Sequence, residues 1–189
     1  LDIIKDRQYT AKSDGIARRS AQTALYHLSE AFVRWIAPIL SFTADEIWDQ
    51  LPGEHSQRVW VAHWYDQLAR LEGGQLSAAD WQQLMTVKNA VNKVLEAARA
   101  AGNIGSSLDA EVVLHCSPQL KTLLDQLQDE LRFVLITSGA EVVAGDIHSG
   151  TIGEATDIDG LHVVIKVSSH EKCERCWHRR EDVGAHSEH

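Results

Sequence analysis

The spacing of apolar residues changes once along this chain, near Gly105, and that change limits the folds the chain can adopt. Before Gly105, apolar residues recur every three or four positions, which is the period of an amphipathic helix. After Gly105, residues 110–116 and 161–167 alternate in the two-residue period of a half-buried strand. The sequence therefore predicts a mainly α protein in which a helical part precedes a small α+β part.

The longest helical pattern covers residues 14–39. Pro38 should end or kink this helix, because proline lacks the amide donor and clashes with the preceding turn. One face carries large apolar side chains at spacings of three and four, and we interpret this stripe as core-facing: Leu25, Leu28, Phe32, Trp35 and Ile39.

Two capping-box patterns mark further helix starts. Thr43–Glu46 predicts a short helix over 44–51, and Ser77–Asp80 begins a helix of about 24 residues that ends before Gly102. We therefore predict that residues 1–102 form an antiparallel helical bundle.

The part after Gly105 is predicted to contain short strands and a helix. A strand over 110–116 is followed by Ser117-Pro118, an N-cap and first-turn pair that opens a leucine-rich helix. Short β-rich runs are expected at 133–137 and 141–143, before the strand at 161–167.

We divide the chain into three expected domains. A helical domain covers 1–104, a small α+β connector domain covers 105–168, and a cysteine- and histidine-rich tail covers 169–189. The tail has almost no core-forming residues and holds only half of a zinc site, so we expect residues 170–189 to be poorly ordered or weakly metallated.

The most specific chemical motif is Cys173-Glu-Arg-Cys176. Two thiolates separated by two residues can bind one zinc ion from a tight knuckle, and structural zinc takes four ligands. Histidines that lie close enough in sequence to be considered as further ligands are His170, His178, His186 and His189. We interpret the motif as half of a zinc site; a knuckle without a metal role and a thioredoxin-like redox motif are the weaker alternatives. The third cysteine, Cys116, fits an inert core thiol, so the pattern indicates a reducing compartment.

The charge pattern leaves room for a nucleic-acid face without proving one. The net charge of −9 argues against a general polyanion binder, but the acidic excess lies almost entirely after residue 105. Cations off the apolar stripes could contact phosphates, although such residues are more often a solvated helix face. The candidate RNA contacts are Arg18, Arg19, Lys88, Asn92, Lys93, Arg99, Arg175, Arg179 and Arg180.

Other classes of site find no support in the sequence. No apolar run is long enough for a membrane helix, and no phosphate-binding loop, dinucleotide fingerprint, nucleophile elbow or zincin motif occurs. The tryptophans Trp35, Trp48, Trp60, Trp64 and Trp81 could stack on bases, but at this spacing we interpret them as core.

Five segments resemble one protein family. Ala37–Trp48, Leu1–Thr10 and Ala17–Tyr26 are similar to the helical anticodon-binding domain of class I aminoacyl-tRNA synthetases. Asp129–Gly139 and Glu171–His178 narrow the resemblance to the C-terminal region of the bacterial isoleucyl group. The resemblance covers essentially the whole chain. Because the chain begins with Leu1 and not with Met, we expect it to be a fragment of a longer protein.

The resemblance implies a function for a longer parent enzyme. Members of that group attach isoleucine to tRNA(Ile) with ATP and Mg, through an adenylate, and carry separate catalytic and editing domains. It implies that this chain recognises the anticodon stem-loop in the cytoplasm, has no catalytic residue of its own, and contacts neither DNA nor membrane. Zinc carries over only onto Cys173 and Cys176, because the second cysteine pair of the family is absent from this sequence.

Three alternatives stay open at this level. The chain could be the equivalent region of a valyl- or leucyl-type synthetase, which the cysteine knuckle argues against. It could be a non-catalytic helical module that binds proteins through an exposed apolar patch. A stand-alone enzyme is a third possibility, disfavoured by the lack of a catalytic motif.

Overall fold

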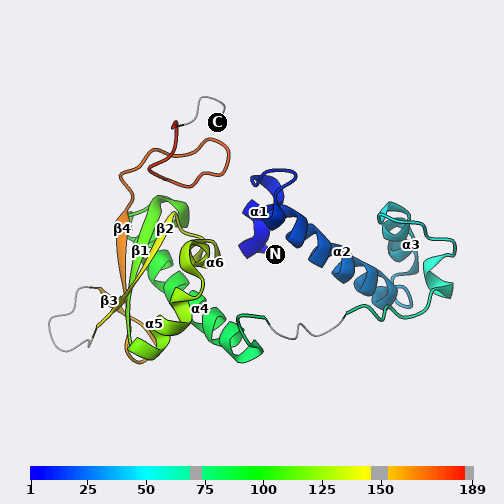
Figure 1. Cartoon of the computed structure of the whole chain (residues 1–189), viewed down its shortest axis with the longest axis horizontal. Helices are drawn as coiled ribbons and strands as arrows, with labels where there is room; N and C mark the ends of the chain where they lie inside the picture. The colour runs from blue at the N-terminus through cyan, green and yellow to red at the C-terminus, as the bar shows by residue number, and fades with distance from the viewer. Residues whose placement is uncertain (69–73, 146–152, 186–189) are drawn as a thin grey trace. The chain divides into compact units, whose positions relative to one another are not determined.

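The computed structural model describes residues 1–68, 74–145 and 153–185 (Figure 1). About half of the described chain is helical, and the strands form one small mixed sheet. The chain separates into two compact units, which we describe one at a time: a sheet unit, Leu1–Asp6 with Gly74–His189, and a helical unit, Arg7–Gly73. Within the described ranges, no helix combines the length and apolar character that a membrane span needs.

The sheet unit is built on four strands in the order β2-β1-β4-β3. The central strand β1 (Ala110–Cys116) runs parallel to β2 (Gly139–Ala144) and antiparallel to β4 (Leu161–Val167), and the two-residue β3 (Glu154–Ala155) pairs with β4. Both seven-residue alternating segments are thus strands, as predicted, and Leu114 of β1 lies opposite Val163 of β4.

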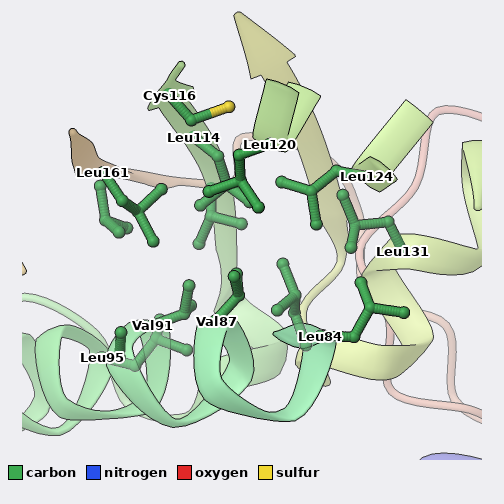
Figure 2. Close-up of a cluster of buried hydrophobic side chains, with 14 of the residues drawn as sticks. Leu84, Val87, Val91, Leu95, Leu114, Cys116, Leu120, Leu124, Leu131 and Leu161 are labelled. Atoms are coloured by element: carbon green, nitrogen blue, oxygen red, sulfur yellow. The ribbon is translucent and has the colours of Figure 1, made fainter. Parts of the chain in front are cut away.

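Helix α4 (Ala78–Ala100) packs on this sheet. Its buried face contributes Leu84, Val87, Val91 and Leu95 to a cluster that also contains residues of β1, β4, α5 and α6 (Figure 2). The sequence grouped α4 with the earlier helices in one bundle over 1–102, but the break between the compact units falls before α4. The physical reason is that α4 buries its apolar stripe in the core it shares with the sheet.

The connection from β1 to β2 consists of short helices. Ser117 caps α5 (Pro118–Asp125) by accepting a hydrogen bond from the Leu120 amide, as its sequence predicts. The prediction of a β run at 133–137 is wrong, because these residues fall mostly in α6 (Leu131–Leu135). Leu131, Val134 and Leu135 recur at helical spacing and are all buried. Burial of this one face therefore favours a helix over the strand that the residue types also allow.

The helical unit has a much smaller core. It consists mainly of α2 (Ile16–Ile36) and α3 (Ser41–Gln50), while α1 (Lys5–Tyr9) begins in the sheet unit and ends in this one. Its buried apolar cluster contains Val33, Ala37, Ala44, Trp48 and Val59. The helix ends at Ile36, just before Pro38, as expected.

The core stripe predicted for residues 14–39 is mostly exposed, and of its five residues only Leu25 is half-buried. Leu28, Phe32, Trp35 and Ile39 are all exposed, with Phe32 at 55%, whereas the buried residues of α2 are Ala21, Glu30, Ala31 and Val33. Trp60, Trp64 and Trp81 are exposed as well, so the core interpretation holds only for Trp48 among the five tryptophans considered. The spacing identified an amphipathic helix correctly but did not show which of its faces this unit covers.

The two capping boxes have different outcomes. Ser77 accepts a hydrogen bond from the Asp80 amide and Asp80 accepts one from the Ser77 amide, so the predicted box opens α4. The other prediction is wrong: α3 begins at Ser41, Leu40 is its N-cap residue, and Thr43 lies inside the helix. The turn after α2 starts α3 earlier, because the amide of Ala44 already donates to the Leu40 carbonyl.

Candidate functional site

The cysteine motif forms a tight knuckle in the tail of the sheet unit. The Cys173 amide donates to the His178 carbonyl at 2.8 Å, and the Trp177 amide donates to the Cys173 carbonyl at 2.9 Å. Trp177 has a φ of 66°, a left-handed conformation that reverses the chain just after the second cysteine. An antiparallel β-bridge between Lys172 and Arg179 joins the two ends of this loop.

The environment of the two sulfurs suits a metal thiolate. Amide groups of Cys176 and Arg175 donate to the Cys173 sulfur, and the Cys176 amide is the largest cause of the lowered pKa of Cys173. Burial raises the pKa of Cys176, and the two thiols are close enough to hydrogen-bond to each other. Adjacent sulfurs with amide donors aimed at them fit zinc, which binds thiolates and is held in such knuckles.

The described residues supply only part of a four-ligand zinc site. No group of three or more His, Cys, Asp or Glu side chains in the described ranges has the arrangement of a metal site. His186 and His189 lie outside those ranges. Cys173 and Cys176 are therefore the two candidate ligands in this part of the structure.

His178, considered from sequence as a further ligand, has another environment. Its side chain is 2% exposed, and its Nε2 lies 3.0 Å from Oδ2 of Asp6 while its Nδ1 lies 3.4 Å from a guanidinium nitrogen of Arg132. The ring also makes an edge-on contact with Phe133 at 5.5 Å between centroids. Because both ring nitrogens are engaged, neither is free to bind the metal.

The cations that follow the knuckle are held by acidic partners. Nε of Arg179 donates to Oδ1 of Asp109 at 2.9 Å, and this hydrogen bond is the largest cause of the lowered pKa of Asp109. The Arg179 amide also donates to Oγ of Ser138 at 2.7 Å, and Arg180 pairs with Asp129 and Asp182. These contacts fasten the tail to the sheet unit.

The nine candidate RNA contacts fall into three groups. Arg18 and Arg19 start α2 in the helical unit, where Arg18 donates to the Ala11 carbonyl at 3.3 Å. Four candidates lie on α4 and three on the tail, all in the sheet unit: Lys88, Asn92, Lys93, Arg99, Arg175, Arg179 and Arg180. The exposed cations Lys93 and Arg99 pair with Asp157 and Glu96, and surface pairs of this kind are weak enough to exchange for a phosphate.

One exposed aromatic residue was missed by the sequence argument. Trp177 is 61% exposed at the tip of the knuckle, and the Lys172 ammonium lies 5.4 Å from the centre of its ring. No apolar periodicity surrounds Trp177, and its position directly after the second cysteine was the signal that could have marked it. The side chain of Arg175, in the same loop, forms no ion pair with the described residues.

Comparison with known proteins finds two matching families. Residues 1–114 match the family described as the anticodon-binding domain of tRNA ligase, and residues 171–189 match a zinc finger found in FPG and IleRS. The first match covers more than half of the chain, so the chain belongs to the anticodon-binding domain family of tRNA ligases.

Particular relatives extend the match to the whole chain. The chain is 58% identical over all its 189 residues to an isoleucine–tRNA ligase of Saccharophagus degradans. It is 53% and 54% identical to isoleucine–tRNA ligases of Marinomonas sp. and Yersinia pestis, also over its full length. In each case the chain spans 20% of the relative's length.

Proposed function

We propose that this chain is the anticodon-recognising part of an isoleucine–tRNA ligase and that it binds the anticodon stem and loop of tRNA(Ile). The observation that carries the proposal is the match with isoleucine–tRNA ligases over the full length of the chain. On this proposal, ATP and Mg serve the catalytic domain of the parent, an editing domain is a second neighbour, and the whole enzyme works in the cytoplasm. The chain alone would have no aminoacylation activity.

The knuckle is the part of the sheet unit best suited to contact bases. Anticodon bases are unstacked, so an exposed ring such as Trp177 can stack on one of them. Lys172 and Arg175 lie in the same loop and carry charges that attract the neighbouring phosphates. When bound, zinc would supply folding energy to this loop, held by Cys173 and Cys176.

The basic residues of α4 and α2 form the second part of the proposal. Lys88, Asn92, Lys93 and Arg99 lie on α4, and Arg18 and Arg19 begin α2. Contacts of these side chains with phosphates would set the register of the RNA without reading its sequence. Among the tail arginines we favour Arg175 over Arg179, because Asp109 already holds the guanidinium of Arg179.

The exposed stripe of α2 is the one observation that favours a protein-binding alternative. Leu28, Phe32 and Trp35 form an apolar face of the kind that docks against another helix. Because the relatives are about five times longer than this chain, we assign this face to contacts inside the parent enzyme. A valyl- or leucyl-type parent has no support from the relatives, which are isoleucine–tRNA ligases.

The test is direct binding of the chain, with zinc supplied, to an isoleucine tRNA transcript and to one with a changed anticodon. We expect binding that weakens with the changed anticodon and falls with salt, by about 0.7 in log K per log salt for each single-strand phosphate contacted. Absence of binding at low salt would contradict the proposal for this chain, and equal binding of both transcripts would leave only a phosphate clamp.

Two variants locate the contact. Trp177→Ala should weaken binding by about 1–3 kcal/mol, the usual range for one stacked base. Trp81→Ala is the matched control, since Trp81 is an exposed tryptophan of α4 in the same unit and lies outside the knuckle. Equal losses from the two variants would argue against base stacking at the knuckle.

A further inference from the structure

The strongest unused feature of the molecule is the buried polar cluster of Asp6, Arg132 and His178. Its three members come from the N-terminal segment, from α6 and from the residue two positions after Cys176. His178 and Arg132 are 2% and 9% exposed, and the Asp6 side chain, at 29%, is partly exposed. Buried polar groups without a partner are costly, so this arrangement depends on all of its members.

The hydrogen-bond partners of His178 assign a role to each of its ring nitrogens. The guanidinium of Arg132 has donors and no acceptor, so Nδ1 of His178 must accept from it at 3.4 Å. With Nδ1 accepting, Nε2 is the nitrogen that donates to Oδ2 of Asp6 at 3.0 Å. The ring thus links a cation to a carboxylate, and each of its nitrogens has one role.

We infer that His178 is a positioning residue for the metal knuckle and not one of its metal ligands. The backbone of His178 is part of the knuckle, because its carbonyl accepts from the Cys173 amide at 2.8 Å. Its side chain meanwhile binds the N-terminal segment and α6. One residue therefore fastens the loop carrying Cys173, Cys176 and Trp177 to two other segments.

Phe133 and Asp129 support the same cluster. The guanidinium carbon of Arg132 lies 3.9 Å from the centre of the Phe133 ring, which also contacts His178 edge-on. Nε of Arg132 donates to Oδ2 of Asp129 at 3.1 Å, so the arginine is held from its far side as well. These contacts fix where Arg132 can place its remaining donors, and hence the orientation of the His178 ring.

This arrangement couples the order of the first residues to the order of the knuckle. Asp6 stands 172 positions before His178, so their hydrogen bond joins nearly the two ends of the described chain within the sheet unit. Breaking it should loosen both segments together. Any effect of this coupling on RNA affinity rests on the proposed function, whereas the coupling between the first residues and the knuckle is independent of it.

The experiment is amide hydrogen exchange of the zinc-supplemented chain, read by mass spectrometry, with His178→Ala, His178→Gln and His115→Ala. His178→Ala should speed exchange roughly tenfold or more in peptides covering residues 2–9 and 172–180, because it leaves buried partners unsatisfied. His178→Gln keeps a donor for Asp6 and should restore much of the protection. His115→Ala removes a half-buried imidazole of β1 outside the cluster and should leave both peptides unchanged.

The pair of partners gives a second readout. Asp6→Ala should reproduce the loosening at 172–180, and adding it to His178→Ala should change little more, because both variants remove the same hydrogen bond. Exchange at 2–9 that stays at the wild-type rate in His178→Ala would overturn the inference. So would a glutamine variant that behaves like the alanine variant.

Metal-binding measurements distinguish a positioning role of His178 from a ligand role, and RNA-binding measurements test the proposed function separately. At saturating metal, His178→Ala should keep the cobalt absorption spectrum of the unchanged chain, because His178 is not a ligand. A changed cobalt spectrum at saturating metal would show a changed ligand set, restore His178 as a ligand and overturn the inference, whereas weaker metal affinity with an unchanged spectrum is what loss of a positioning residue produces. If neither the wild type nor Trp177→Ala binds the anticodon stem-loop, the proposed function fails, while the exchange result still decides the role of His178.

Discussion

The two compact units are stabilised in different ways. The sheet unit closes a continuous apolar core between α4 and the strands, and Leu114, Leu124 and Leu161 are fully buried there. The helical unit buries few large side chains and exposes much of the apolar face of α2. Since apolar burial is the main stabilising term in folding, the sheet unit should be the more stable of the two. The helical unit instead depends more on the buried ion cluster of Glu30, Arg34 and His55.

The largest expected effect comes from truncating a core leucine. Leu124→Ala should destabilise the sheet unit by about 2–5 kcal/mol, because it removes a fully buried side chain and leaves a cavity. Phe32→Ala, on the exposed face of α2, should change the free energy of unfolding of the helical unit by less than about 1 kcal/mol. Hydrogen exchange resolved by peptide measures the two units separately. A loss at Phe32 as large as the loss at Leu124 would show that the α2 face is covered within this chain.

A second prediction concerns Glu30, which is 2% exposed inside the helical unit. Arg34 donates to Glu30 at 2.6 Å and His55 lies 2.9 Å from its other oxygen. Glu30→Gln should destabilise the helical unit by roughly 1–3 kcal/mol, because it leaves the buried partners of a carboxylate imperfectly satisfied. The peptide-resolved exchange of α2 and α3 measures this loss, and the exchange of α4 should not change.

The same carboxylate makes the helical unit sensitive to acid. Burial raises the pKa of Glu30, but the hydrogen bonds from Arg34 and His55 outweigh it and lower the pKa below its usual value. A lowered pKa contributes stability that is fully present above the pKa of the unfolded chain and is lost as the pH falls through the folded value. Exchange in α2 should therefore accelerate as the pH falls through the acid range, after correction for the intrinsic rate. Glu30→Gln should flatten this dependence, and an unchanged acid response in that variant would assign it to another group.

The smallest expected effect compares the two capping patterns. Ser77→Ala should cost about 1 kcal/mol in the sheet unit, since Ser77 caps α4 through a reciprocal bond with Asp80. Thr43→Ala should cost much less, because Thr43 lies inside α3 and caps nothing. Peptide-resolved exchange of the first turn of each helix measures both changes. Equal losses would mean that the Thr43 hydroxyl stabilises α3 in a way its position does not indicate.

Much of the fold followed from local patterns. The two strands with period-two alternation, the start of α4 at Ser77 and the end of α2 before Pro38 were all predictable, because each depends on residues close in sequence. The run 133–137 was not predictable in this way, since its residues suit either a strand or a helix. Packing of Leu131, Val134 and Leu135 on one buried face settled it as a helix.

The candidate site shows the same division. Cys173-x-x-Cys176 was readable as a metal knuckle, because the thiolate pair and its spacing carry the chemistry. The role of His178 was not readable, because its partners Asp6 and Arg132 are far away in sequence. Trp177 was missed because exposure, which makes it a contact residue, leaves no periodic signal.

The sequence by itself determined the two alternating strands, the start of α4, the end of α2, the spacing of the two knuckle cysteines and the family the chain resembles, since these depend on spacing and on residue type. Only the tertiary structure decided that α4 packs on the sheet, that the apolar stripe of α2 is exposed, and that His178 binds Asp6. The physical reason is that burial and polar pairing are properties of contacts between distant segments. An amphipathic pattern predicts that one face of a helix packs against other residues, and only the tertiary structure shows which residues those are.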